Sequence, residues 1–81
     1  MKVRVYVSPK PTVLDPQGQA IQKALQSQGH SSVAAVRQGK FFEIALGDGV
    51  DRAAATKEME QIAHDVLANP VIEVYRVEIL D

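Results

Sequence analysis

The sequence predicts an α+β protein whose elements follow the order strand–helix–strand–strand–helix–strand. Three observations lead to this prediction: strand-like alternation near both ends of the chain, two segments with helical spacing, and turn or cap signals at the boundaries. In this order the strands form an antiparallel sheet and both helices pack on one of its faces. We therefore expect a ferredoxin-like sandwich of four strands and two helices, formed by a single domain over residues 1–81.

The N-terminal segment 2–8 alternates strictly, with Val3, Val5 and Val7 on one side and polar or aromatic residues on the other. β-Branched residues at a period of two are typical of a strand with one buried face. The prolines of Pro9-Lys10-Pro11 cannot donate to a sheet ladder, so we expect the strand to end there.

The first helix is predicted to start at Asp15-Pro16. The Asp15 carboxylate can accept hydrogen bonds from the free amides of the first turn, and Pro16 fits the first helical position without losing a bond. Gly29 suits the left-handed residue that closes a helix. The apolar stripe between these signals is narrow: Ala20, Ile21, Ala24 and Leu25.

Residues 33–46 return to strand composition and are expected to form two strands. The sequence Gln38-Gly39-Lys40 predicts a tight turn between them. On the second of these strands Phe42, Ile44 and Leu46 share one face, which we assign to the same buried side as the valines of the first strand.

A second helix is predicted after Asp51, which can cap it, and Asn69-Pro70 is expected to stop it. Its apolar positions form an amphipathic stripe: Ala55, Met59, Ile62, Ala63, Val66 and Leu67. The last run, from Val71 to Leu80, has strand composition, with Val77 and Ile79 on the inward side.

The totals restrict both stability and partners. A chain of 81 residues has a thin core, and without cysteine neither a disulfide nor a thiolate metal site can reinforce it. Packing or self-association must supply that stability. The net charge of −1 argues against a nucleic-acid partner. The chain has no continuous apolar stretch of signal-peptide or membrane length, so the cytoplasm is the expected location.

Two helices on one side would leave the other face of the sheet uncovered. This outward face mixes two aromatics and a valine with charged residues, and by parity it includes Arg4, Tyr6, Phe41, Glu43, Val74 and Arg76. Exposed apolar patches often mark contact surfaces, although scattered apolar residues on a solvated face are also common. We interpret the face as a surface for self-association or for a partner, because a thin core gains from association.

No catalytic, cofactor or metal site is predicted. The two histidines, His30 and His64, have no second ligand at a metal-binding spacing. No serine lies in a nucleophile elbow, and Gly47-Asp48-Gly49 lacks the Lys-Ser/Thr that follows a phosphate-binding loop.

Proteins of the same fold serve two other functions that the sequence must be compared with. RNA-recognition modules stack bases on strand aromatics, and Tyr6 and Phe41 occupy comparable outward positions. However, Glu43 beside them and the slightly negative charge oppose phosphate binding. The other alternative is a stand-alone regulatory or ligand-binding module, which rests on analogy of fold alone.

Four segments closely resemble the PurS family, the small subunit of phosphoribosylformylglycinamidine synthase: Lys2 to Val7, Lys10 to Gly18, Val36 to Lys40 and Leu67 to Glu73. The resemblance runs from end to end, and the second and last segments are its most specific parts. The residues that match the family's loops include Lys10, Pro11, Asp15, Pro16, Gly18, Asn69 and Pro70. Two positions depart from the family pattern, Val74 in place of an acidic residue and Phe41-Phe42 in place of an aromatic and an aliphatic residue.

This resemblance implies a subunit without an active site. Such a subunit pairs with itself, as a dimer or a dimer of dimers, and bridges a large synthetase subunit and a glutaminase subunit. Ammonia from glutamine is then used in the ATP-dependent conversion of formylglycinamide ribonucleotide to its amidine in purine biosynthesis. The resemblance also implies that ATP, Mg²⁺ and glutamine are used by the partners, with no cofactor on this chain.

Overall fold

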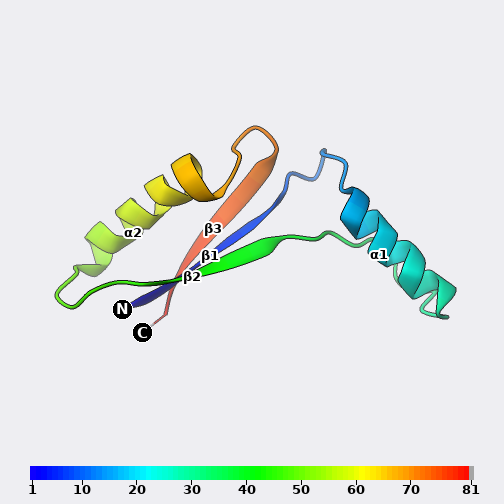
Figure 1. Cartoon of the computed structure of the whole chain (residues 1–81), viewed down its shortest axis with the longest axis horizontal. Coiled ribbons are helices and arrows are strands. Elements are labelled where there is room, and N and C mark those ends of the chain that lie inside the picture. The colour runs from blue at the N-terminus through cyan, green and yellow to red at the C-terminus, as the bar shows by residue number, and fades with distance from the viewer. Residues whose placement is uncertain (81) are drawn as a thin grey trace.

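The computed structural model describes residues 1–80, which form two helices and a three-stranded antiparallel sheet (Figure 1). In chain order the elements are β1 (Lys2–Pro9), α1 (Pro16–Ser27), β2 (Lys40–Ala45), α2 (Arg52–Ile62), the π-helical turn η1 (Ala63–Leu67) and β3 (Glu73–Leu80). The predicted α+β class is confirmed, and the last strand begins two residues later than the sequence composition indicates.

The sheet has the order β2-β1-β3, so β1 is the central strand. In its register Val5 lies opposite Phe42 on β2 and opposite Val77 on β3. Val3 lies in the same way between Ile44 and Ile79. These pairs confirm the inward face that the alternation predicts.

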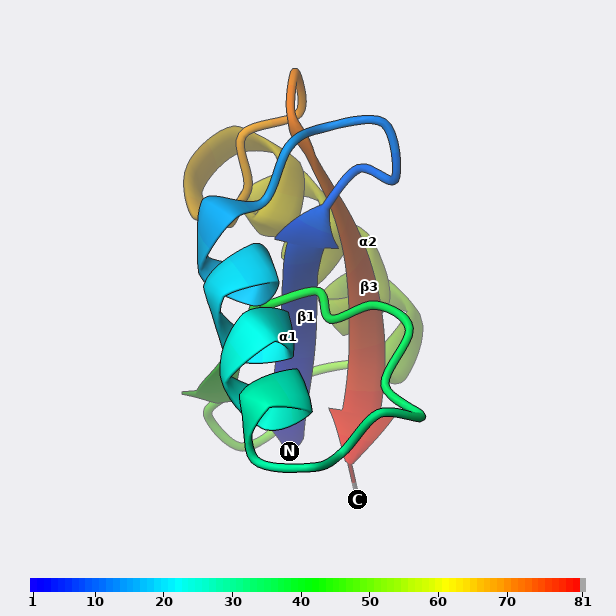
Figure 2. The ribbon, with the colours of Figure 1, turned by 90° about the vertical axis from the view of Figure 1, so that its right-hand side faces the viewer.

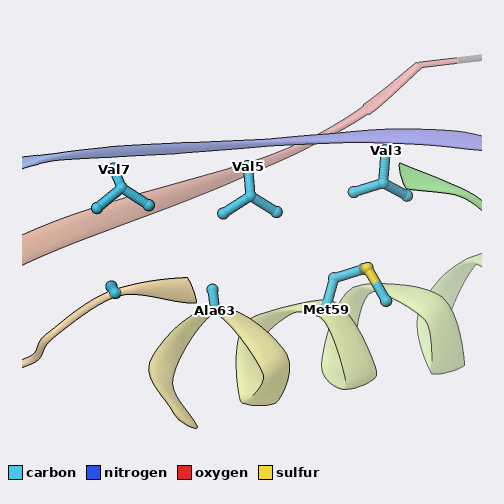
Figure 3. Close-up of a cluster of buried hydrophobic side chains, with 6 residues drawn as sticks. Val3, Val5, Val7, Met59 and Ala63 are labelled. Atoms are coloured by element: carbon cyan, nitrogen blue, oxygen red, sulfur yellow. The ribbon is translucent and has the colours of Figure 1, made fainter. Parts of the chain in front are cut away.

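The core lies between this inward face and the second helix. The side chains of Val3, Val5 and Val7 point toward Met59 and Ala63 of the helical segment (Figure 3), and all five are essentially buried. A second set of apolar side chains is only partly buried around this cluster: Phe42, Ile44, Leu46, Ile62, Leu67, Val77 and Ile79. The burial of the central valines is what fixes α2 on the sheet.

The end of the second helix contains a π turn that the helical spacing of the sequence does not indicate. The Ala68 amide donates to the Ala63 carbonyl oxygen at 2.8 Å, five residues back instead of four. The inserted residue turns Ala68 into the core and leaves Val66 74% exposed. The prediction that Val66 belongs to the buried stripe is therefore wrong.

The predicted fourth strand and the tight turn at Gln38-Gly39-Lys40 are absent from the described residues. Residues 33–39 are extended but join no sheet ladder. They run beside α1 instead, where the side-chain amides of Gln22 and Gln26 donate to the carbonyl oxygens of Ala34 and Val33 at 2.9 and 3.0 Å. These side-chain hydrogen bonds satisfy backbone groups that a hairpin would have used.

The expectation that both helices cover one face is also wrong for the single chain. Helix α1 lies beyond the end of the sheet and makes no substantial contact with another helix or strand among residues 1–80 (Figures 1 and 2). The molecule is 51 Å long with a radius of gyration of 16.1 Å, against about 12 Å for a compact domain of this size. We call residues 10–38, which contain α1 and the extended segment, the arm.

Candidate interaction site

The outward face of the sheet brings the predicted contact residues together. Arg4 lies opposite Glu43 on β2, and Tyr6 lies between Phe41 on β2 and Arg76 on β3. Val74 shares this face at the start of β3, opposite Ser8 at the end of β1. The positions of the six residues are as the parity predicts, while their contact with a partner stays a prediction.

Most of the polar groups on this face already have partners. The Arg4 guanidinium forms an ion pair with Glu43 at 3.0 Å and donates to the Tyr6 hydroxyl at 3.4 Å. The Tyr6 hydroxyl donates in turn to Glu78 at 3.1 Å. The hydrogen bonds to Tyr6 and Glu43 raise the pKa of the Arg4 guanidinium. This network ties all three strands together and holds the central side chains in place.

The apolar part of the face lies at its two edges. The Arg76 guanidinium sits 4.3 Å from the centre of the Tyr6 ring and covers it, whereas Phe41 is 56% exposed and Val74 is 45% exposed. A ring already covered by a guanidinium and bonded at its hydroxyl is a poor platform for a base. The face therefore favours a protein contact around Phe41 and Val74 over the RNA alternative.

A second region lies at the base of the arm, around the Asp15 carboxylate. One carboxylate oxygen accepts from the Gly18 amide at 3.0 Å, which is the predicted helix cap, and the other accepts from the Gln38 amide at 2.8 Å. These hydrogen bonds, that of Gln38 first, lower the pKa of Asp15. The same carboxylate thus starts α1 and fixes the end of the extended segment beside it.

Two further residues close this junction. A β-carbon at Gly18 would overlap the carbonyl oxygen of Val36, so only glycine allows the two parts of the arm to approach this closely. The Arg37 guanidinium donates to the carbonyl oxygens of Pro11 and Val13, the latter at 2.7 Å. The segments 10–18 and 36–40 both match the PurS pattern. The contacts around Asp15, Gly18 and Arg37 hold these two segments together and form the junction at the base of the arm.

The last of the family-matching segments, residues 67–73, closes the same end of the molecule. The Asn69 side chain accepts from the Val71 amide at 3.1 Å, and the Asn69 amide donates to the Glu73 carboxylate at 2.8 Å. The Lys10 amide donates to the Ile72 carbonyl oxygen at 2.9 Å, which joins this loop to the arm. Figure 2 shows the two loops, blue and orange, at the top of the view.

The structure also gives roles to residues that the sequence pattern does not single out. Pro16 occupies the first position of α1 and Pro70 lies exposed in the loop before β3, as expected. The parts played by Arg37 and Gln38 in holding the arm were not predicted. The only signal for them was the match of the segment 36–40 to the family pattern, because a single arginine and a glutamine carry no periodicity.

The fold and these two regions define a small α+β protein whose prominent features are surfaces suited to contact with other chains. Within residues 1–80, no group of three or more metal-ligating side chains is assembled, and no helix is long and apolar enough to cross a membrane. The sequence pattern of PurS, described as phosphoribosylformylglycinamidine (FGAM) synthase, matches residues 2–81. The chain belongs to the PurS family.

Individual relatives agree with this assignment. The PurS subunit of phosphoribosylformylglycinamidine synthase from Bacillus subtilis is 47% identical, with 96% of this chain and 90% of the relative covered. The same subunit from Synechocystis is 43% identical, over 94% of this chain and 75% of the relative. The sequence similarity therefore extends along almost the whole chain.

Solved structures share the fold as well. A crystal structure of Bacillus subtilis PurS superposes with a TM-score of 0.79 at 44% identity, covering 99% of this chain and 98% of that chain. A chain of the PurLQS structure from Thermotoga maritima gives a TM-score of 0.86 at 26% identity, over 98% of this chain and 95% of that one. The agreement covers nearly the whole length of each chain, so it includes the arm.

Proposed function

We propose that this chain is the non-catalytic small subunit of phosphoribosylformylglycinamidine synthase, and that it bridges the glutaminase and large synthetase subunits. The observation that carries the proposal is the PurS match across residues 2–81. The similarity to a chain of the PurLQS structure supports a role inside a complex. The exposed outward face of the sheet offers a surface for such contacts.

In this role the chain contributes contacts while its partners perform the chemistry. The glutaminase releases ammonia, and the synthetase uses ATP and Mg²⁺ to convert formylglycinamide ribonucleotide to its amidine. A bridge that keeps the two subunits together excludes water from the route between them, so that ammonia is used before it is lost. We place this work in the cytoplasm, and we assign no cofactor to this chain itself.

Self-association is part of the proposal. The four-stranded ferredoxin-like sandwich that the sequence predicts is, on this view, completed only in the assembled protein. The single chain supports this interpretation. Over the described residues 1–80 its sheet lacks one strand and one covering helix, while its arm carries an extended segment and a helix of its own.

The bridging role is tested by measuring amidine formation by the purified large and glutaminase subunits, with and without this chain. We expect the chain to be required when glutamine is the nitrogen source and to be dispensable when an ammonium salt replaces it. If the chain changes neither rate, the bridging assignment is wrong. If it is required equally with both sources, it acts in the synthetase reaction and not as a bridge.

The outward face is tested by Phe41→Ser in the same assay. Because this ring is 56% exposed, its loss should change the stability of the chain little while weakening a contact made through it. We expect glutamine-dependent activity at limiting subunit concentration to fall about tenfold, with the ammonium-dependent rate unchanged. Val71→Ser, which removes a smaller apolar side chain that is 76% exposed in the loop before β3, is the control. Equal activity of the two variants would remove Phe41 from the contact.

A further inference from the structure

The outer side of the second helical segment carries a groove that no other part of residues 1–80 fills. It lies on α2 and η1 and has a volume of about 190 Å³. Two aliphatic residues, Ile62 and Val66, line it together with three polar ones, Glu58, Gln61 and Asp65. Ile62 is half-buried, and the other four are exposed, Val66 to 74%. Pockets for small molecules usually measure about 300–1,000 Å³, so this groove suits a side chain of another protein.

The π turn is the reason that Val66 lies in this groove. In a regular helix Val66 would follow Met59 and Ile62 on the buried side. Ala68 instead takes the inward position, five residues after Ala63, and Val66 turns outward. Inserted residues of this kind within helices occur frequently at functional sites. The exposed valine is therefore better explained as part of a contact surface than as an isolated surface residue.

The charged groups that line the groove are all acidic. They are the carboxylates of Glu58 and Asp65, and no lysine or arginine of residues 1–80 joins them. No ion pair or hydrogen bond within residues 1–80 engages Glu58, whereas Asp65 has an exposed partner in His64 at 2.9 Å. Carboxylates beside aliphatic side chains favour a partner that presents an aliphatic residue next to lysine or arginine, and they oppose an acidic one.

The groove and the outward face of the sheet lie on opposite sides of the molecule. Helix α2 packs on the inward face, where Met59 meets the valines of β1 (Figure 3), so the sheet separates the groove from Phe41 and Val74. A bridging chain needs two surfaces that do not overlap, because each partner must bind while the other is in place. The outward face offers one of them, and the groove meets the requirement for the second.

We propose that this groove is the second partner surface of the chain, and that it holds an aliphatic side chain flanked by lysine or arginine from one of the two bridged subunits. The outward face of the sheet then contacts the other subunit. This inference rests on the bridging role proposed above and adds the place and the chemistry of the second contact. Opposite charges orient the partner, and burial of Val66 against its aliphatic side chain removes apolar surface from water.

A second copy of this chain is a poorer occupant than a bridged subunit. A twofold contact of the groove with itself would place Glu58 and Asp65 against the same carboxylates of the other copy, where like charges oppose association. A copy bound there would also cover the surface that a bridge needs for its second partner.

Cross-linking in the assembled complex identifies the occupant, because the natural chain has no cysteine. Gln61→Cys, at the groove, is labelled with a photoreactive maleimide, assembled with the large and glutaminase subunits and irradiated. We expect cross-links to one of the two subunits, in a peptide with an aliphatic residue next to lysine or arginine. Ala53→Cys, exposed on α2 outside the groove, is the control and should give at least fivefold fewer cross-links to that peptide. Equal yields from the two positions, or cross-links to another copy of this chain alone, would overturn the proposal.

Charge reversal gives an independent measurement. Glu58→Lys should raise at least tenfold the concentration of this chain that gives half-maximal amidine formation with glutamine. Glu60→Lys makes the same change at an exposed residue of the same helix outside the groove, and should stay within about twofold of the natural chain. Equal effects of the two substitutions would contradict the proposal.

The natural chain, assayed first, separates this inference from the bridging role. If glutamine-dependent synthesis requires the chain but Glu58→Lys and Glu60→Lys behave alike, only the groove is refuted. If glutamine-dependent synthesis does not require the chain, the bridging role and the inference that rests on it are both refuted.

Discussion

At the scale of single residues, Asp15 and Gly18 hold the arm at its base. Asp15 is 8% exposed, and its two oxygens accept from amides that are far apart in the sequence. Its bond to Gly18 follows from the local cap, whereas its bond to Gln38 requires the arm to be folded. Substitution of either residue therefore tests the junction between the start of α1 and residues 36–38, and not only the stability of the helix.

Gly18→Ala should separate the start of α1 from the segment around Val36. The added methyl group would overlap the Val36 carbonyl oxygen and the Asp15 carboxylate. That carboxylate is held in place by the Gly18 and Gln38 amides. We expect a loss of about 1–3 kcal/mol in the free energy of unfolding, measured with urea. Gly47→Ala is the control, because a β-carbon at Gly47 meets nothing within 4 Å. If the two substitutions cost the same, the close approach at Gly18 does not matter.

The Asp15 carboxylate also predicts a dependence on pH. Its pKa is lowered in the folded chain from an ordinary 3.8, so its stabilisation is complete above that value and is lost as the pH falls through the lowered folded pKa. Asp15→Asn should therefore destabilise the protein at pH 7, and the difference from the natural chain should shrink below about pH 4. Urea unfolding at several pH values measures this, and a constant difference would contradict it.

At the scale of elements, the π turn shows how helical spacing can be misread. The sequence places Val66 and Leu67 on the stripe begun by Ala55 and Met59, and three successive residues from Val66 to Ala68 are all apolar. Periodicity cannot say which of the three faces inward. The sheet decides it, because the extra residue of the π turn buries the smallest side chain, Ala68, against the core.

Two substitutions in this helical segment distinguish a buried position from an exposed one by their effect on stability. Met59→Ala should cost about 2–5 kcal/mol in the free energy of unfolding, because Met59 is fully buried against the valines of β1. Val66→Ala should change it by no more than about 0.5 kcal/mol, because Val66 is 74% exposed. Thermal or urea unfolding distinguishes the two. A large loss at Val66 would mean that the helix continues without the π turn.

The buried faces of the strands can be predicted from the sequence more reliably than the buried faces of the helices. The inward and outward faces of the sheet follow directly from alternation, and the register confirms them from Arg4 to Tyr6 on the central strand. Because a side chain on a strand can point only to one face or the other, parity leaves little freedom once one residue is placed. The six residues predicted for the outward face therefore share that face, even though the sheet formed by residues 1–80 has one strand fewer than predicted.

At the scale of the whole molecule, the extended shape leaves α1 without substantial contact with another helix or strand among residues 1–80. We therefore expect contact with another chain to contribute to the free energy that holds the arm. Association that occurs only in the folded state raises the midpoint of unfolding with concentration. We expect the thermal midpoint to rise by several degrees over a hundredfold increase in protein concentration, measured by calorimetry. A midpoint independent of concentration would show that the arm is stable without a partner.

The sequence by itself determined the class of the protein, the faces of its strands, the starts of both helices and, through its match to PurS segments, the family. These properties depend on neighbouring residues, whose alternation, caps and prolines act within a few positions of each other. Only the tertiary structure decided whether residues 33–38 form a strand of their own sheet and where α1 lies. That decision depends on hydrogen bonds between distant parts of the chain, those of Asp15 and Arg37 above all, and no local pattern records which distant partner a side chain will meet.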